Sequence, residues 1–534
     1  MSAAAAAETA VRRWARGPYE SSIALTAGLV WMLAPPLFVG AAVFGMLRGD
    51  GEDAAALLLS GAAVGAVGAV TVRLCRPERN LTVRQMLTAL MVGVLAAVGV
   101  VMVANLATGT VGFGRLDVAL VSSAATVTAT NATALDLTRL SDAMLAFRAG
   151  GQWLSGAGFV VMLVGVLPHL GVGGLDAEGG VATRSARRLA PRRVATMARL
   201  LLLYCLLTAL VAVGYLAARM PTADAVLHSL TTISTGGYSP YADSIGHFGS
   251  AAVEWVAVAG MVAGGTSLPL MFLAIRRADP LRLLRSYEFG VYLGLIAVCA
   301  AWVMVWGPDA ESAGGMLGPT AIRHAVFAAS SAASTTGFSV SDMTAMAGGG
   351  GVVLVMAMVV GGMSASLSGG FKAVRLLALL SYVRRELRRA MYPALVARIH
   401  LRRSTVGERT VSRIAGELLM AALLAVPAAL LLSAGGLDLV GAWSLVASAL
   451  SNVGPALGEA GPDGHLLALG WLARVTVAAL MLTGRVSVTA AAVAVSVAAF
   501  PVVMAGERLV LRLGRRGEED GAGGPADRAG RSAD

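Results

Sequence analysis

The chain has 534 residues, of which 57% are hydrophobic and only 14% are charged, and its formal net charge is +11. This composition excludes a soluble globular domain and is typical of a protein that lies in a lipid bilayer. The arginines stand in short runs between apolar segments, as they do in the cytoplasmic loops of membrane proteins. We therefore expect membrane lipid, and no nucleic acid, around this chain.

Two apolar segments open the chain, at residues 22–47 and 54–73, and each is long enough to span a membrane. An acidic turn joins them, and a basic stretch beginning at Arg73 follows the second. The positive-inside rule then places the amino terminus and the 73–84 loop in the cytoplasm. We expect residues 1–85 to form two transmembrane helices ahead of the main body.

After residue 85, one unit is repeated four times. Each unit has an apolar span, a semi-polar segment that ends in a turn, a polar stretch and a second apolar span. The turns end at Asn131, Gly236, Gly337 and Gly454, roughly 100 to 120 residues apart, and such a period is typical of duplicated supersecondary units. The predicted pore repeats cover 86–181, 182–286, 287–400 and 401–510, with spans near 86–108 and 152–172, 197–219 and 250–275, 288–306 and 350–381, and 414–434 and 465–502.

Arginine-rich loops follow all four units. These loops lie on one side of the membrane only if each unit crosses twice and its semi-polar middle enters and returns. The predicted fold is an all-α polytopic membrane protein with two amino-terminal helices and four helix, pore-loop, helix repeats around one pseudo-fourfold pore. Both termini are expected in the cytoplasm, and the Gly-, Asp- and Arg-rich tail at 511–534 is expected to be disordered.

The four turns carry the residues expected of a cation path. A short helix before each turn would direct the negative end of its dipole toward the pore centre. Glycine permits strained backbone angles, so that carbonyl oxygens face inward and replace the water shell of a small cation. The predicted filter residues are Ala129, Thr130, Asn131, Ser234, Thr235, Gly236, Thr335, Thr336, Gly337, Asn452, Val453 and Gly454.

An acidic residue follows each turn: Asp136, Asp243, Asp342 and Glu459. These residues are interpreted as an outer vestibule that raises the local cation concentration. The alternative is that they are the acids that any exposed loop carries, and the sequence leaves both interpretations open.

A glycine- and serine-rich stretch interrupts the second span of unit three. It contains Gly361, Gly362, Gly369 and Gly370, followed by Lys372, the only lysine of the chain. A break in the helix would form a loop able to obstruct or open the pore. The alternative is a helix-packing face, because small residues are common where membrane helices touch.

Arg485 lies in the middle of the last span. A charge at this depth is costly and usually faces a cavity or a partner. We expect Arg485 to act as an electrostatic barrier below the turns or as a latch for the loop, and snorkelling to the interface is the alternative.

The remaining reactive residues form no catalytic set. Cys75, Cys205 and Cys299 show no metal or redox spacing, the six histidines form no ligand set, and no span carries an Asp pair or a Ser with a base. The chain is not expected to be an enzyme, and no intrinsic cofactor is expected. A cation-coupled carrier of another solute would require a carboxylate near mid-membrane, and the nearest candidate, Glu254, lies by a span end.

Over residues 86–500 the chain resembles the Trk/Ktr/HKT superfamily of potassium-uptake membrane proteins. Besides the turns, the resemblance rests on the stretch from Gln152 to Gly158 continuing to Leu167-Pro168, on Gly361-Gly362 to Arg375, and on Ser451 to Pro455. The two additional amino-terminal spans are more similar to the Trk branch membrane subunit.

The resemblance implies potassium as the transported ion and a bacterial cytoplasmic membrane as the location. It also implies a homodimer with one pore per subunit, a separate cytoplasmic regulatory subunit that binds a nucleotide, and a gate formed by the broken helix and Arg485. The family has glycine where this chain has Asn131, with serine in some sodium-carrying plant members, and often glutamate where it has Ser487. The Asn131 side chain would narrow the ring or donate a hydrogen to it, so the alternatives are a sodium-permeable or weakly selective transporter, or a non-conducting relative that scaffolds a regulatory partner.

Overall fold

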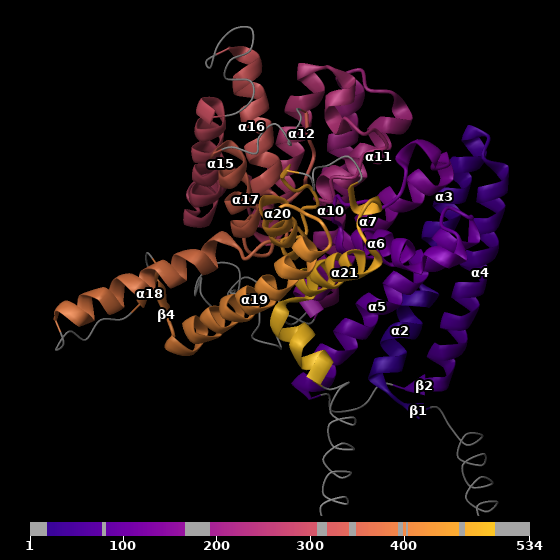
Figure 1. Cartoon of the computed structure of the whole chain (residues 1–534), viewed down its shortest axis with the longest axis horizontal. Coiled ribbons are helices and arrows are strands. Elements are labelled where there is room, and N and C mark those ends of the chain that lie inside the picture. Colours follow the sequence, from indigo (N-terminus) through magenta and orange to yellow (C-terminus); the bar gives the residue numbers. More distant parts are fainter. Residues whose placement is uncertain are drawn as a thin grey trace, which may run out of the picture.

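The computed structural model describes residues 19–76, 82–165, 193–306, 318–340, 349–392, 399–401, 404–458 and 465–496. The protein is an all-helical, multi-pass membrane protein (Figure 1). In these ranges six helices are long and apolar enough to cross a membrane, or up to eight if each of two bent helix pairs is one span. The predicted tail at 511–534 and the first 18 residues lie outside the described residues.

The amino-terminal helices pack together at the right of Figure 1. They are α2 (Ser22–Met32), α3 (Pro35–Arg48) and α4 (Gly51–Leu74), with a short parallel pair of strands, β1 (Tyr19–Glu20) and β2 (Cys75–Arg76). The first predicted span is divided between α2 and α3, because Pro35 and Pro36 cannot continue the hydrogen-bond ladder of α2. Gly68 allows α4 to lie close to α2, since a Cβ there would be 2.3 Å from the Met32 nitrogen.

The rest of the chain repeats the same sequence of elements: a long helix, a short helix, a turn and a helix. The four units are α5 (Val83–Ala107), α6 (Leu116–Thr128) and α7 (Asp142–Gly165); α10 (Arg193–Ala217), α11 (Thr222–Ile233), α12 (Ala251–Gly264) and α13 (Leu268–Arg276); α15 (Tyr287–Trp306), α16 (Pro319–Ala333), α17 (Gly349–Val360) and α18 (Ala373–Met391); and α19 (Glu408–Ala434), α20 (Leu439–Leu450) and α21 (Trp471–Val486). The predicted fold class is confirmed, whereas the residue boundaries of the four repeats stay a prediction.

Short elements join the helices within and between these units. They are the 3-10 turns η1 (Phe113–Arg115), η2 (Leu137–Arg139), η4 (Ser244–Phe248) and η8 (His465–Leu467), and the four-residue helix α14 (Leu281–Leu284). Apolar cores lie between neighbouring units, while large apolar side chains such as Leu202, Leu206 and Leu210 on α10 remain exposed. An exposed apolar stripe on a spanning helix is suited to contact with lipid.

The second helix is broken in three of the four units, although the sequence predicted a break only in unit three. The α12–α13 pair bends by 100° and α21 bends by 111° into the helix at Val488–Ser496. The segments at 250–275 and 465–502 are therefore not continuous spans. At the first bend, the Gly264 and Gly265 carbonyls accept from the Leu367 and Met363 N–H groups of unit three, at 3.3 and 2.9 Å. At the second bend, the Ser487 N–H still donates to the Thr483 carbonyl of its own helix, at 3.0 Å.

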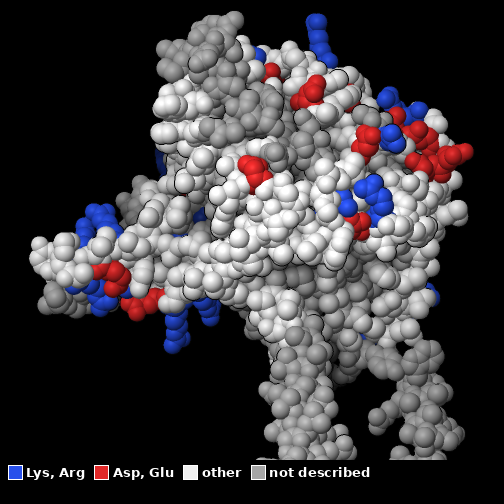
Figure 2. All heavy atoms as spheres, in the orientation of Figure 1, with Lys and Arg blue, Asp and Glu red and all other residues white. Residues whose placement is uncertain are grey.

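An arm projects from the body at the left of Figure 1. It consists of α18, the first part of α19 and the antiparallel pair β3 (Ile399–Leu401) and β4 (Ser404–Val406). Arg385 on α18 pairs with Glu386 at 2.7 Å and Glu408 at 2.8 Å; burial alone disfavours its charged form, but the bonds to the two glutamates raise the pKa of the guanidinium. Charged side chains gather on this arm and over the upper part of the molecule (Figure 2).

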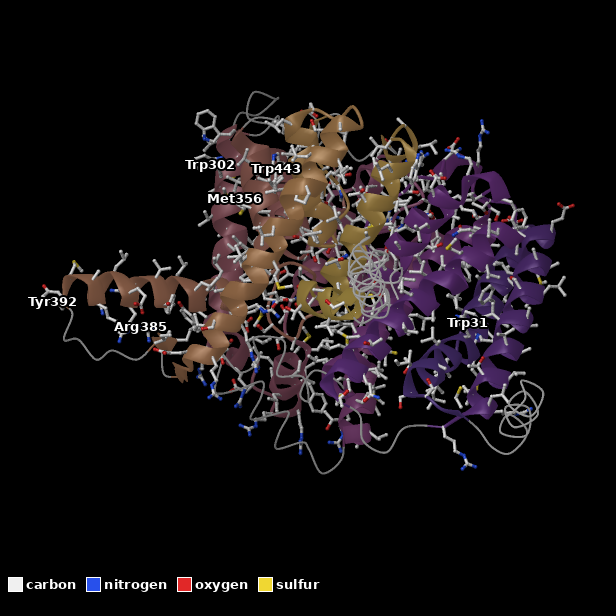
Figure 3. All side chains as sticks on the ribbon, turned by 60° about the horizontal axis from the view of Figure 1, so that its bottom comes forward. Trp31, Trp302, Met356, Arg385, Tyr392 and Trp443 are labelled. Carbon is white, nitrogen blue, oxygen red and sulfur yellow. The ribbon has the colours of Figure 1, made fainter. Side chains whose placement is uncertain are left out.

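Large apolar side chains are exposed on the outside of several helices (Figure 3). Trp302 on α15, Met356 on α17 and Trp443 on α20 are exposed at one side of the body, and Trp31 lies among the amino-terminal helices. The Trp31 indole nitrogen donates to the Ala96 carbonyl at 2.9 Å, which fastens α2 to α5.

Candidate functional site

The four short helices α6, α11, α16 and α20 end in the same backbone geometry. The residue after each helix or one further adopts a left-handed conformation, with φ of 50° at Ala129, 54° at Thr235, 58° at Thr335 and 56° at Asn452. The next residue always donates its N–H to the carbonyl five residues back. These bonds run from Thr130 to Ala125, Gly236 to Thr231, Thr336 to Ser331 and Val453 to Ser448, at 2.9 to 3.0 Å. This shared motif at a helix end makes the turns structurally equivalent.

The equivalence corrects the predicted register of the second turn. The residues that correspond to Asn131 are Gly237, Gly337 and Gly454, with φ of 63°, 84° and 114°. The sequence pattern predicted Gly236 in this set, but Gly236 corresponds to Thr130 and Thr336. Two adjacent glycines stand at this turn, and only their backbone angles distinguish them.

The turns converge. The Asn131 N–H donates to the Val453 carbonyl at 2.9 Å, and the Asn452 side-chain amide donates to Thr130 Oγ1 at 3.3 Å. A Cβ at Gly237 would lie 1.8 Å from the Thr336 carbonyl oxygen, and one at Gly337 would lie 2.6 Å from that of Val453. Glycine is therefore required where neighbouring turns touch, and the predicted filter residues of all four units lie together.

Asn131 occupies the space between the turns. A Cβ added at Gly237 or at Gly337 would lie only 3.1 Å from the Asn131 Cβ. The Asn131 Nδ2 donates to the Gly337 carbonyl at 2.7 Å. The amide thus donates a hydrogen to the ring of carbonyls, as the sequence suggested it would. The first turn contributes a donor where the other three have no side chain.

Hydroxyl groups hold the turns in place. Thr231 Oγ1 donates to the Tyr238 carbonyl at 2.9 Å, Ser331 Oγ donates to the Phe338 carbonyl at 2.7 Å, and Ser448 Oγ accepts from the Gly454 N–H at 2.9 Å. These side chains are fully buried or nearly so. These serine and threonine hydroxyls are therefore bonded to the backbone of their own turns.

The residues 361–372 between α17 and α18 are not helical, so the stretch is a break and not a helical packing face. The Met363 N–H donates to the Gly265 carbonyl at 2.9 Å, and the Ala365 carbonyl accepts from the Leu268 N–H at 3.2 Å. The loop also touches the turns, because the Gly369 N–H donates to Thr335 Oγ1 at 2.7 Å. The loop therefore fills the bend of the α12–α13 pair and lies directly against the third turn.

The loop also contacts the fourth turn through Gly369. A Cβ there would lie 2.0 Å from the Ser451 carbonyl oxygen. Gly361 and Gly370, with φ of 69° and 74°, close the loop on itself, since a Cβ at Gly361 would be 2.5 Å from the Gly369 oxygen. A Cβ at Gly362 would likewise lie 2.7 Å from the Gly265 carbonyl oxygen. A side chain would therefore collide with neighbouring atoms at all four predicted loop glycines.

Both candidate gating cations contact this loop. The Lys372 Nζ donates to Ser366 Oγ at 3.3 Å, to Ser368 Oγ at 3.0 Å and to the Ser368 carbonyl. Arg485 donates from Nη1 to the Leu367 carbonyl at 3.3 Å and from Nη2 to Ser155 Oγ at 3.4 Å. The Arg485 guanidinium stays inside the protein, so it does not snorkel to the interface.

A cavity of about 410 Å³ lies beside the loop and the fourth turn. Its polar lining includes Ser368, Asn452, Lys372 and Arg485, and its wall contains the ion pair of Arg375 with Glu417 at 3.0 Å. Most of its remaining lining is apolar, so this cavity is an apolar space with a few polar and cationic groups on the side of the turns and the loop.

Three polar contacts at this site were not predicted from the sequence. Gln152 on α7 donates to the Thr130 carbonyl at 3.1 Å, and a Cβ at Gly236 would lie 2.2 Å from the Gln152 Oε1. Glu288 on α15 accepts from the Ser364 N–H of the loop. Gly265 accepts from Met363. A polar residue within an apolar span was the available signal for Gln152 and Glu288.

The proposed acidic vestibule is only partly described. Asp136 is exposed and pairs with Arg139 at 3.1 Å, and Asp243 is exposed at the start of η4. Asp342 and Glu459 lie outside the described residues. The vestibule therefore stays a prediction.

A family model described as TrkH: Cation transport protein matches residues 115–500, which include all four turns, the 361–372 loop and Arg485. This chain belongs to the TrkH family. Membership makes it a transport protein and not an enzyme, and it confirms the predicted superfamily.

Relatives of this TrkH-family chain cover most of its length. The Trk system potassium uptake protein TrkH of Halomonas elongata is 35% identical over 377 residues, 69% of this chain and 75% of that protein. TrkH of Escherichia coli is 30% identical over 369 residues, 68% of this chain and 75% of that protein. The crystal structure of the potassium transporter TrkH from Vibrio parahaemolyticus matches with a TM-score of 0.76 and 26% identity, covering 88% of this chain and 97% of that one.

Proposed function

We propose that this protein takes up potassium ions across the cytoplasmic membrane through a pore whose narrowest part is formed by the four turns. The observation that carries the proposal is the convergence of four equivalent turns, in which glycine is required at three positions because the backbones of neighbouring turns lie so close together. A ring of carbonyl dipoles replaces the hydration shell of a monovalent cation. The relatives named potassium uptake proteins support potassium as the ion.

The gate of this pore is the 361–372 loop together with Lys372 and Arg485. The loop lies against the third and fourth turns, and both cations hold it through serine hydroxyls and backbone carbonyls. In this arrangement Arg485 is at once a latch, through Leu367, and a positive barrier below the turns. Opening requires these contacts to exchange for others as the loop moves.

A weakly selective or sodium-permeable transporter is the second candidate, and Asn131 favours it. Its amide takes the Gly337 carbonyl that would otherwise coordinate an ion. A carrier of another solute is less well supported, because its candidate carboxylate, Glu254, is paired with Arg323 at 2.6 Å and buried.

The membrane orientation, the oligomeric state, the partner and the outer vestibule are also proposals. The arginine-rich loops after each unit support a cytoplasmic location for both termini. The active form is a homodimer with one pore per subunit, and a cytoplasmic nucleotide-binding regulatory subunit docks on the inner loops. Asp136, Asp243, Asp342 and Glu459 form the outer vestibule.

The decisive experiment is flux into liposomes that contain the purified protein, measured for potassium, rubidium, sodium and lithium in parallel. We expect potassium and rubidium to enter, and growth of potassium-uptake-deficient bacteria on limiting potassium to be restored. A well-inserted protein that carries none of these ions would contradict the proposal. Equal entry of sodium and potassium would select the weakly selective transporter instead.

A further inference from the structure

A buried arginine lies between the first two turns, and the proposed filter and gate do not account for it. Arg148 on α7 is only 1% exposed. Its Nη1 donates to Ser122 Oγ at 2.7 Å and its Nη2 to the Ala132 carbonyl at 3.3 Å. Its guanidinium carbon lies 4.7 Å from the centre of the Tyr238 ring.

These contacts place one guanidinium at the outer ends of two turns. Ala132 directly follows Asn131 in the first turn, and Tyr238 directly follows Gly237 in the second. The bond to Ala132 holds that carbonyl toward α7, and the ring of Tyr238 receives the cation on its face. Arg148 therefore fixes the spacing of the two turns from behind.

The charge of Arg148 lacks the carboxylate partner that three partly buried arginines have. Arg323, Arg375 and Arg474 each pair with a carboxylate, at 2.6, 3.0 and 2.6 Å. Within the described ranges no carboxylate pairs with Arg148, and its Nε has no hydrogen-bond partner. Arginine stays protonated in proteins, and a buried uncompensated charge is costly. A charge retained at such a cost inside a membrane protein indicates a role in function.

We propose that Arg148 is a positioning residue that sets the cation affinity of the pore. Its fixed positive charge behind the first and second turns raises the free energy of a cation held between them. Ions then bind weakly enough to leave, which conduction requires. The inference rests on the proposed function, because it assumes that cations pass between the turns.

The test measures initial rates of rubidium entry into liposomes as a function of external rubidium, and separates the half-saturating concentration from the maximal rate. Arg148→Met removes the charge, and we expect the half-saturating concentration to fall about tenfold, the effect of one charge about 10 Å away at an effective dielectric constant of about 20. Arg148→Lys keeps the charge, and we expect this concentration to stay within about twofold of the wild type, with a lower maximal rate.

A second pair of variants neutralises the charge while Arg148 stays in place. Ser122→Asp introduces a carboxylate at the Nη1 hydrogen bond, and we expect the same fall in half-saturating concentration. Its matched control, Ser122→Ala, removes the hydrogen bond and keeps the charge, so that the concentration should not change. If Arg148→Met does not assemble in detergent, the difference in half-saturating concentration between Ser122→Asp and Ser122→Ala tests the role of the charge.

Two outcomes overturn the proposal: a folded Arg148→Met with the wild-type half-saturating concentration, or Ser122→Asp and Ser122→Ala that do not differ from each other. Either would leave Arg148 with a purely structural role. Failure of the proposed function is distinguishable, because the wild-type protein itself would then carry no rubidium.

Discussion

Asn131 is the residue at which this chain differs most from a ring built of four glycines. Its Nδ2 donates to the Gly337 carbonyl and its N–H donates to the Val453 carbonyl, so one residue satisfies an oxygen on each of two other turns. A hydrogen-bonded carbonyl is less available to an ion. Selectivity in this protein is therefore expected to depend on a single side chain.

We expect Asn131→Gly to raise the potassium-to-sodium permeability ratio, because it frees the Gly337 carbonyl and widens the ring. The ratio is measured from ion fluxes into liposomes under matched gradients. Asn131→Ala is the control: it also removes the donor but keeps the Cβ that lies close to Gly237 and Gly337. An unchanged ratio in both variants would show that the amide does not relax selectivity.

Arg485 has two roles that substitution can separate. We expect Arg485→Gln to increase flux several-fold, because the positive charge below the turns is lost while an amide can still donate to the Leu367 carbonyl. Arg485→Leu removes the donor as well and should increase flux further, with a shorter lifetime of the closed state in single-channel records. Equal flux in the wild type and both variants would exclude Arg485 from the gate.

At the scale of elements, the helix ends decide which glycines are irreplaceable. Gly237→Ala places a Cβ against the backbone of Thr336 at a φ of 63°, and left-handed geometry alone costs about 1 to 2 kcal/mol. We expect a lower thermal unfolding temperature in detergent and loss of flux. Gly236→Ala meets the movable side chain of Gln152 and should be milder.

Gly290→Ala on α15 is the matched control for these two variants, since a Cβ at Gly290 would meet no atom within 4 Å. Its unfolding temperature should equal or exceed that of the wild type, because alanine favours helix more than glycine does. If Gly236→Ala were the more damaging of the first two, the register of the second turn would be wrong.

The sequence predicted some of these elements and missed others, depending on whether the element is set by local residues or by distant contacts. Apolar length and glycine-bearing turns indicated the repeated units and the break at 361–372, because both are local properties of the chain. The bends after Gly264 and at Ser487 were missed. The first is bonded to unit three through Gly265 and Met363, and the second packs through Val486 and Ala490 on Leu87 of unit one, so both involve residues far away in the chain. Which of Gly236 and Gly237 corresponds to Asn131 could be decided only from backbone angles, because the two adjacent glycines are identical in the sequence.

At the scale of the whole molecule, ion pairs join neighbouring units, and two of them involve the short helices that precede the turns. Asp117 on α6 of unit one pairs with Arg474 on α21 of unit four, and Glu254 on α12 of unit two pairs with Arg323 on α16 of unit three, both at 2.6 Å. All four side chains are less than one fifth exposed. These two pairs thus join unit one to unit four and unit two to unit three.

We expect Arg474→Met to destabilise the protein by about 3 kcal/mol, because it leaves the Asp117 carboxylate partly buried without its cation. Adding Asp117→Asn should recover much of this loss. The free energies are obtained from denaturant unfolding in detergent as a double-mutant cycle. Additive effects of the two substitutions would mean that the pair contributes no coupling.

Repeats in the sequence predicted that the turns would meet, because four equivalent units tend to enclose one axis. They did not predict which units touch, or that Arg148 would stand uncompensated behind two of them. Such contacts are set by side chains that differ between the units, and these are the positions at which a repeat pattern carries no information.

The bond between Asn452 and Thr130 joins residues that are 322 positions apart in the chain. During synthesis the first turn therefore enters the bilayer long before the residues that complete it have left the ribosome. Its amide and hydroxyl groups must find temporary partners, such as water or the insertion machinery, until the last unit arrives. A truncated product that stops before residue 452 would expose these groups to lipid, and quality-control proteases are expected to remove it.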